Sequence, residues 1–346
     1  MTVVRYGIIG CGAIAQRRHI PECVANPDSK LVALADPIQA RGEELGRKYG
    51  AVSFIDYKQM LKAAPLDAVV VCGPNHLHAE QAIAALKSGR HVLVEKPMAT
   101  TLKDAKATID AARKAGKYLM VGQNQRLMPA HVKAKAILAA GTLGKVLSFY
   151  TSFKHSGPEN WSVDASKSWF FQRDQAIMGV TGDLGVHKAD LMRWLLGEEI
   201  TEVAGVVAPL DKRGPDGKLI ALDDNASFTV RTASGVVGCI ELSWTNYGEE
   251  DNKTILYCQK GVMYLGTDPT YGVIVRYRNG DAEMHKVGEM ATNVKQVASG
   301  VIDAFTHSIL SKTPPEIDGN EGYRSLQVIL TAMAAAKAGK MMKIVG

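Results

Sequence analysis

The 346-residue chain carries near its start a glycine-rich motif whose residue types suit phosphate binding. It contains Gly10, Gly12 and Ala15 in the pattern Gly-x-Gly-x-x-Ala, after a β-branched run and before a helical pattern. In that setting the first glycine permits a tight turn, the second lets the backbone approach a pyrophosphate, and the small third residue allows close helix–strand packing. Ala13 and Ile14, where the helix begins, complete the predicted phosphate site, since a helix N-terminus offers free N–H groups. A plain structural turn is the alternative.

An acidic residue, Asp36, ends the second predicted strand. Its carboxylate would accept hydrogen bonds from the ribose hydroxyls of NAD and would repel the additional phosphate of NADP. Strand, loop, helix, strand and acid follow one another in the order of a dinucleotide-binding unit. We therefore predict NAD as the cofactor, with NADP as the weaker alternative.

A second motif, Glu95-Lys96-Pro97, ends an apolar strand with a charged pair and a proline. In an open α/β sheet, the carboxyl ends of the strands line the ligand crevice. This position favours a functional role for Glu95 and Lys96, close to the cofactor, over a solvated ion pair in a surface turn.

A third motif contains Asp183, Gly185 and His187, with Asp190 three residues further on. If Asp183 caps a helix, His187 lies one turn later on the same face and within its reach. A carboxylate beside an imidazole raises its basicity and fixes its orientation, as a general acid/base requires. A capping Asp followed by an unrelated buried His explains the spacing equally well. No metal is predicted, because the spacing lacks the further ligands of a zinc site.

Two more groups of polar residues follow predicted strands. Pro74, Asn75 and His78 come after the strand at 68–72, where Asn75 would either cap a helix or contact the cofactor.

Asn124 and Arg126 follow the last strand of the N-terminal half and are substrate candidates. Arg126 could bind the substrate or a cofactor phosphate, or form an ion pair between domains, and we slightly favour the ion pair. His155 and Trp169 are further substrate candidates, although aromatic side chains in that stretch are as well explained by packing.

The elements that position these residues are of two kinds. Up to residue 121, short β-branched runs alternate with helical patterns, which predicts a doubly wound parallel sheet. The expected strands are 3–9, 30–35, 68–72, 91–94 and 118–121, and the expected helices are 14–25, 38–49, 79–88 and 102–115.

After Gly122 the pattern changes to alternating stretches joined by tight polar turns, which predicts an α+β domain with an open, mainly antiparallel sheet. Three helices, at 186–196, 297–310 and 323–337, would cover one face of it. We expect two closely packed domains, residues 1–122 and 123–346. The expected strands are 145–153, 202–207, 226–232, 236–244, 253–259, 262–265 and 272–277.

Composition excludes several classes of function. Forty-one Lys+Arg against 35 Asp+Glu leave a net charge of +6 with no basic–aromatic cluster, which argues against a nucleic-acid partner. No apolar run approaches the roughly 18 residues of a membrane span. Five cysteines without a close pair indicate a reducing compartment, so we expect a cytoplasmic protein.

Together, the motifs resemble those of the GFO/IDH/MocA family, named for glucose–fructose oxidoreductase, inositol dehydrogenase and a rhizopine catabolism protein. The resemblance spans essentially the whole chain, including a closing Asp-Gly before an Ala-rich helix. It rests on the glycine loop, Asp36, Pro74-Asn75-x-x-His78, Glu95-Lys96-Pro97, Asp183-x-Gly185-x-His187 and Asp318-Gly319.

The resemblance implies a Rossmann domain followed by an open-sheet domain through which members often form dimers or tetramers. Members mostly oxidise or reduce a secondary alcohol of a sugar, inositol or related polyol with NAD or NADP. By the family's pattern, Lys96 would hydrogen-bond the reacting oxygen, His187 would be the general base, and Asp183 would orient the substrate and His187. Before Asp183 many members have consecutive glycines and a leucine, whereas only Gly179 and Gly182 stand here, so the substrate cannot be carried over.

Two alternatives stay open at this point. Relatives that keep NAD tightly bound use transient oxidation to cleave glycosides with largely the same residues. A sensor that binds the dinucleotide without chemistry is the other alternative, but it would have no need of Lys96, Asp183 and His187 together.

Overall fold

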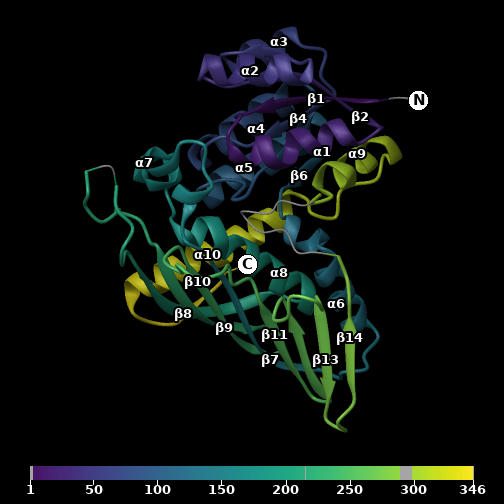
Figure 1. The fold of residues 1–346 in the computed structure, drawn as a ribbon, viewed down its shortest axis with the longest axis vertical. Helices are drawn as coiled ribbons and strands as arrows, with labels where there is room; N and C mark the ends of the chain where they lie inside the picture. Colours follow the sequence, from purple (N-terminus) through teal and green to yellow (C-terminus); the bar gives the residue numbers. More distant parts are fainter. Residues whose placement is uncertain (1–2, 215, 289–297, 346) are drawn as a thin grey trace.

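The computed structural model describes residues 3–214, 216–288 and 298–345, in which two β-sheets organise the chain (Figure 1). The first sheet has six parallel strands in the order β3-β2-β1-β4-β5-β6, which confirms the doubly wound prediction. Its strands are β1 (Val4–Ile9), β2 (Ser29–Ala35), β3 (Val52–Phe54), β4 (Ala68–Val71), β5 (His91–Val94) and β6 (Leu119–Val121).

Helices connect these strands, and most of their bounds lie close to the predicted ones. The helix expected at 14–25 is a π-helical turn followed by a short α-helix. The sequence analysis missed β3 and α3, because a three-residue strand and a seven-residue helix are too short to show a period. The connecting helices are η1 (Ala15–His19), α1 (Ile20–Ala25), α2 (Gln39–Tyr49), α3 (Tyr57–Ala63), η2 (Asn75–Leu77), α4 (His78–Lys87) and α5 (Leu102–Ala115).

The register of the first sheet aligns the ends of its central strands. Ile9 pairs with Val71, Val71 with Val94, and Val94 with Val121. The loops that follow these four strands therefore all start at the same edge of the sheet. Ile9 also pairs with Ala35 of β2. Motifs far apart in the sequence therefore meet at the carboxyl edge of the sheet, where open α/β folds bind ligands.

Among the described residues the second sheet has nine strands in the order β14-β13-β12-β11-β7-β10-β9-β8-β15, and only β7 and β10 are parallel neighbours in it. The prediction of a mainly antiparallel sheet is therefore confirmed, although β14 and β15 were not expected. The strands are β7 (Val146–Lys154), β8 (Ile200–Ala208), β9 (Asn225–Thr232), β10 (Val237–Ser243), β11 (Thr254–Cys258), β12 (Gly261–Leu265), β13 (Val273–Tyr277), β14 (Ala282–His285) and β15 (Met342–Lys343).

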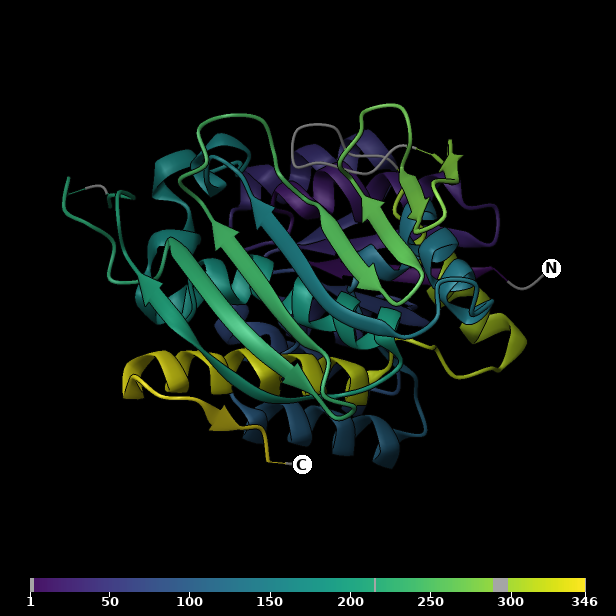
Figure 2. The same ribbon diagram turned by 90° about the horizontal axis from the view of Figure 1, so that it is seen from below.

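Helices α8 (Val186–Leu196) and α10 (Gly319–Ala338) lie on one side of this sheet, whereas α6 (Pro129–Ala139) packs near its β12 end. Figure 2 shows the sheet from below, with α10 running along it and the outer face of the strands toward the viewer. Helix α10 also contacts α5 and β6, so it joins the two sheets.

The placement expected for the helix at 297–310 is wrong. Helix α9 (Val301–Ser311) packs against β1 and α1 of the first sheet, beside which it is drawn in Figure 1. The hydroxyls of Tyr6 and Thr306 are 2.8 Å apart, and the rings of Tyr6 and Phe305 are 6.5 Å apart. The helical pattern shows which face of α9 is buried but not which sheet receives it. Val297 lies outside the described residues, and the division at residue 122 stays a prediction.

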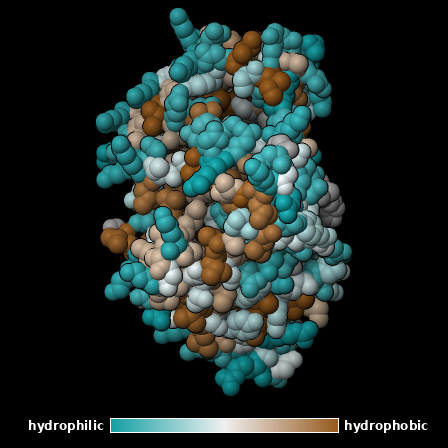
Figure 3. All heavy atoms as spheres, turned by 90° about the vertical axis from the view of Figure 1, so that its left-hand side faces the viewer, coloured by the Kyte–Doolittle hydropathy of each residue, from teal (hydrophilic) through white to brown (hydrophobic). Residues whose placement is uncertain are grey.

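Figure 3 shows one side of the molecule, on which hydrophobic residues are interspersed with hydrophilic ones, as is usual for protein surfaces. Within the described ranges, no helix is long and apolar enough to cross a membrane. The same residues contain no group of three or more His, Cys, Asp or Glu side chains arranged to hold a metal ion.

Candidate active site

Two adjoining cavities lie along the carboxyl edge of the first sheet. The larger, of about 850 Å³, is bordered by the predicted cofactor residues Gly10, Gly12, Ala13, Ile14, Asp36 and Pro74. The narrower, of about 80 Å³, is bordered by the predicted catalytic residues Lys96, Asp183 and His187. Both cavities share Ile14, Cys72, Gly73, Trp161, Trp169 and Phe170, so a ligand can extend from one into the other.

The structure explains glycine at Gly10 and at Gly12 in different ways. Gly10 has φ +88°, and a Cβ there would lie 2.7 Å from the backbone nitrogen of Gly73, so the fold itself requires glycine. A Cβ at Gly12 would meet no atom of the protein within 4 Å. The space beside Gly12 therefore opens into the larger cavity, as the close approach of a pyrophosphate requires.

Asp36 is buried and organises the loops around the larger cavity. Its two carboxylate oxygens accept hydrogen bonds from the backbone N–H groups of Cys11 and Ile38, each at 2.8 Å. An ionised carboxylate has about four acceptor positions, so it retains capacity for the ribose hydroxyls of NAD. Arg41 lies 3.8 Å from the same carboxylate and binds Asp164 at 2.6 Å.

The segment 158–176, which follows β7, closes the larger cavity from the side of the second sheet. Asn75 donates its amide to the carbonyl of Ala176 at 3.0 Å, and the His76 ring donates to the carbonyl of Gln175 at 3.1 Å. Asn75 does not cap the turn that it begins. Within this segment lie η4 (Pro158–Asn160), η5 (Ala165–Lys167), η6 (Trp169–Phe171) and α7 (Arg173–Ala176).

His78 and Glu95 border the narrower cavity, and each also ties loops together. The ring nitrogens of His78 lie 2.8 Å from the carbonyl oxygens of Gly73 and Pro97, which joins the loops after β4 and β5. The Glu95 carboxylate contacts His19 Nε2 at 2.8 Å and Arg18 at 3.7 Å. Burial would raise the pKa of Glu95, but the hydrogen bond from His19 and the charge of Arg18 outweigh burial and hold that pKa well below its usual range.

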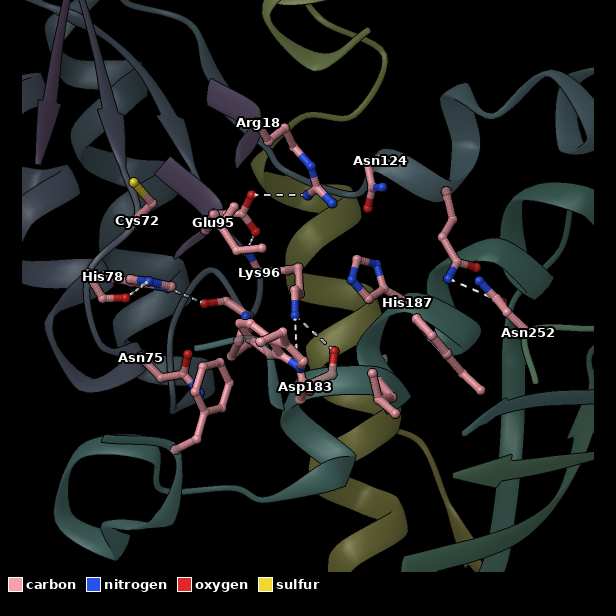
Figure 4. Close-up of a pocket in the computed structure, with 18 of the residues that line it drawn as sticks. Arg18, Cys72, Asn75, His78, Glu95, Lys96, Asn124, Asp183, His187 and Asn252 are labelled. Atoms are coloured by element: carbon pink, nitrogen blue, oxygen red, sulfur yellow. Dashed lines mark hydrogen bonds and ion pairs between the residues drawn. The ribbon is translucent and has the colours of Figure 1, made fainter. Parts of the chain in front are cut away.

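Lys96 and Asp183 form a buried ion pair across the two halves of the chain (Figure 4). Lys96 Nζ donates to Asp183 Oδ1 at 2.8 Å and to the Asp183 carbonyl oxygen at 3.0 Å. The indole N–H of Trp244 donates to Asp183 Oδ2 at 3.0 Å. Burial would raise the pKa of Asp183, but the Lys96 ammonium outweighs it, and the carboxyl stays ionised.

The expected helix cap at Asp183 is wrong. Asp183 does not cap a helix but lies inside a π-helical turn, η7 (Thr181–Gly185), which continues directly into α8. A π turn contains more residues than an α turn, so residues four apart no longer stack directly. The partners of the Asp183 carboxylate are Lys96 and Trp244, and no hydrogen bond joins it to His187 among the described residues.

His187 is buried at the cavity wall, and its ring centre lies 6.1 Å from that of Phe153. Burial, and next the positive charge of Lys96, lower its pKa well below the usual value of histidine. The imidazole is therefore neutral near pH 7, which is the form that accepts a proton.

The substrate candidates are placed differently from one another. Asn124 and Trp169 border the narrower cavity. Arg126 does not border it; its guanidinium binds Asp190 and Glu321, each at 2.6 Å, as the ion-pair alternative expects.

His155 also lies outside the lining residues, behind Asp183. Its Nδ1 accepts the N–H of Gly157 at 2.9 Å, so the proton of the neutral ring is on Nε2, 3.8 Å from Asp183 Oδ2.

The sequence analysis missed several residues of the site. Trp244 and His19 contact Asp183 and Glu95 across 61 and 76 positions of sequence, and no local pattern signals such pairs. Gln125 stands in the stretch that contains Asn124 and Arg126, but no sequence pattern marks it as a residue that borders the cavity together with Asn124. Asn252 and Phe170 complete the wall.

Comparison with known proteins agrees with this geometry. Residues 4–123 match the model of an oxidoreductase family with an NAD-binding Rossmann fold, and residues 131–264 match the GFO/IDH/MocA C-terminal domain. The chain belongs to the GFO/IDH/MocA family. The predicted family, fold class and NAD cofactor are thereby confirmed.

Three similar proteins illustrate the range of this family. Levoglucosan dehydrogenase of Pseudarthrobacter phenanthrenivorans is 33% identical over 66% of this chain and 62% of its own length, somewhat less than two thirds. The scyllo-inositol 2-dehydrogenase (NAD(+)) of Bacillus subtilis is 28% identical over 76% of this chain and 74% of its own. A structure of aldose-aldose oxidoreductase from Caulobacter crescentus, complexed with glycerol, is 26% identical with a TM-score of 0.83, covering 99% of both chains. These matches favour a sugar or polyol oxidoreductase over the glycosidase and the sensor.

The open space at Gly12 predicts that Gly12→Ala folds normally but binds NADH at least about tenfold more weakly, because the added methyl group occupies the space for phosphate. Fluorescence titration measures the affinity, and thermal unfolding measures the stability. Gly10→Ala is the matched control and should lower the unfolding temperature, because its Cβ would collide with the backbone. A Gly12→Ala protein with unchanged affinity for NADH would contradict the assignment of the phosphate site.

The position of Asp36 predicts that Asp36→Ala weakens the binding of NAD by about tenfold more than the binding of NADP. The variant removes the acceptor for the ribose hydroxyls and the negative charge that repels an additional phosphate, and it leaves Arg41, which lies 3.8 Å from the Asp36 carboxylate. Because Asp36 also holds two backbone N–H groups, the ratio of the two dissociation constants is the quantity to measure. Equal weakening of both cofactors would show that Asp36 acts only on the loop.

Proposed function

We propose that this protein catalyses the NAD-dependent oxidation of a secondary alcohol on a sugar, inositol or related polyol, or the reverse reduction. The observation that carries the proposal is the meeting of Lys96, Asp183 and His187 at one narrow cavity that adjoins the dinucleotide cavity. The narrow cavity favours a small substrate, and the names of the similar proteins support a sugar or polyol.

Lys96 is proposed to hold the reacting oxygen of the substrate. Its ammonium has three donors, and Asp183 supplies acceptors for two of them, through the carboxylate and through the backbone carbonyl. The third N–H remains for the substrate oxygen, on which negative charge develops when the hydroxyl proton leaves. The Asp183 carboxylate is in turn held by Trp244, so the position of the ammonium is set by two other groups.

His187 is proposed as the general base. Its neutral imidazole borders the same cavity as Lys96 and is in the protonation state that accepts the hydroxyl proton. NAD, when bound in the larger cavity, supplies the acceptor for the hydride. Trp169 and Phe170 are stacked with ring centres 3.9 Å apart and border both cavities, so they exclude water from the boundary.

The first test measures NADH absorbance with the purified protein, NAD, and levoglucosan, scyllo-inositol, myo-inositol and methyl β-D-glucoside. Oxidation of at least one of them is expected. Release of a phenol from an aryl glycoside without net NADH would instead support the glycosidase mechanism.

If His187 is the base, His187→Asn should lower kcat by about 10²–10⁴-fold, while the affinity for NADH stays within about twofold. For the wild type, the lowered pKa of His187 predicts a kcat/KM for oxidation that does not fall at about pH 6.5, the ordinary histidine value, but only at lower pH. Steady-state kinetics across pH provides both measurements. A variant with ordinary turnover would remove His187 from the mechanism.

We also propose that the protein forms a homodimer or homotetramer through the outer face of the second sheet. The register places Val206, Val237 and Tyr257 on that face, opposite the buried side chains, and their side chains are 66%, 44% and 42% exposed. Figure 2 shows this face free of the helices that cover the other side. Apolar side chains exposed on the uncovered face of a sheet favour association.

The oligomer proposal predicts that Val206→Lys combined with Tyr257→Lys converts the assembly into monomers, because buried charges without partners oppose association. Analytical ultracentrifugation measures the mass. Val52→Lys, at a 58% exposed position of the first sheet, is the control and should leave the assembly intact. A wild type that sediments as a monomer would overturn the proposal.

A cytoplasmic location is proposed from the cysteines. Cys11, Cys23, Cys72, Cys239 and Cys258 are all free thiols in the structure. Free thiols are typical of reducing compartments. Cell fractionation tests this, and recovery from an oxidising compartment would contradict it.

A further inference from the structure

Two side-chain amides on the wall of the narrower cavity have unused hydrogen-bonding groups. Gln125 belongs to the turn η3 (Asn124–Leu127) after β6, and Asn252 lies in the loop before β11. Gln125 Nε2 donates to Asn252 Oδ1 at 3.5 Å. Gln125 Oε1 and Asn252 Nδ2 have no hydrogen-bond partner within the described residues, although both atoms are buried and both side chains border the cavity.

The unused groups are complementary to a hydroxyl. If both amides are turned over, the pair still bonds once and still leaves one carbonyl oxygen and one NH₂ group. Buried polar groups without partners destabilise a protein, so such a pair on a cavity wall is expected to bind a ligand. A hydroxyl both donates and accepts, and one hydroxyl can therefore satisfy both amides at once.

The backbones of the two residues are held in place, so the amides are preorganised. The carbonyl oxygen of Gln125 lies 2.7 Å from His131 Nδ1. Next to Asn252, Asp251 accepts from the Ser152 hydroxyl at 2.7 Å and pairs with Lys154 of β7 through the backbone.

Asn252, the partner of Gln125, lies on the side of His187 that faces away from the cofactor loops. Figure 4 shows Asn252 beyond His187, on the opposite side from His78 and Cys72, which belong to the cofactor loops. A substrate whose reacting hydroxyl is at Lys96 and His187 would therefore extend another part of its ring toward Gln125 and Asn252.

We propose that Gln125 and Asn252 together bind a second, non-reacting hydroxyl of the substrate. This inference rests on the proposed oxidoreductase function and assigns two further substrate-binding residues to its site. Two neutral amides suit a neutral hydroxyl, whereas a carboxylate or phosphate is matched by cationic donors. Arg126, in the same turn, is engaged by Asp190 and Glu321 instead.

The test compares Gln125→Met and Asn252→Leu with the wild type, using levoglucosan and scyllo-inositol as substrates. Each variant should raise KM about tenfold with less change in kcat, and each should leave the affinity for NADH unchanged. Gln123→Met is the matched control, because Gln123 is a buried amide of the same loop that borders neither cavity. Its KM should stay at the wild-type value, and thermal unfolding should show all variants folded.

Deoxy derivatives of the oxidised substrate provide the discriminating measurement. With the wild type, kcat/KM for the derivative that lacks the bound hydroxyl should be about tenfold lower than for the parent substrate. With Gln125→Met, the derivative and the parent substrate should have similar kcat/KM values, because the substitution has already removed the interaction. The inference would be overturned, and the proposed function left standing, if removal of the hydroxyl lowered kcat/KM equally in wild type and variant. An unchanged KM in both variants would have the same consequence. Failure of every polyol to be oxidised, with NADH bound, would overturn the proposed function and this inference together.

Discussion

The ion pair between Lys96 and Asp183 connects the two parts of the site. Taking both charges out of water is costly, and only good geometry and further hydrogen bonds compensate for that cost. Asp183 meets these conditions, because its carboxylate accepts from Lys96 and Trp244 and its carbonyl also accepts from Lys96. The loop after β5 is thereby fixed to the turn before α8, and this attachment also positions His187, the proposed base, at the same cavity.

Two further networks of buried charged side chains add connections of the same kind. Glu95 binds His19 and Arg18 of the helix after the glycine loop, so the phosphate loop is tied to the strand that carries Lys96. Arg126 binds Asp190 of α8 and Glu321 of α10. Removal of one member of such a network leaves a buried charge without compensation, which typically costs about 3–5 kcal/mol. These charged groups therefore add to the packing of α10 in holding the two sheets in their relative position.

Burial also sets the protonation state of His187. In the enclosed cavity the Lys96 charge acts on His187 with little screening by water, and together with burial it keeps the imidazole neutral. A cation for the reacting oxygen and a neutral base for the proton can therefore coexist at one wall. The segment 158–176 closes the dinucleotide cavity from the other half of the chain, so neither half forms the site alone.

The sequence by itself determined the parallel sheet, and it predicted the phosphate loop, Asp36 and the two candidate catalytic motifs, because hydrophobic period and glycine or strand-end position are local properties of the chain. Tertiary structure decided which groups meet. Local spacing suggested His187 as the partner of Asp183, whereas packing supplied Lys96 and Trp244. It also placed α9 on the first sheet and set Asn252 beside Gln125, 127 positions away. Such contacts depend on register and on how buried charges find partners, and neither is encoded within one short segment.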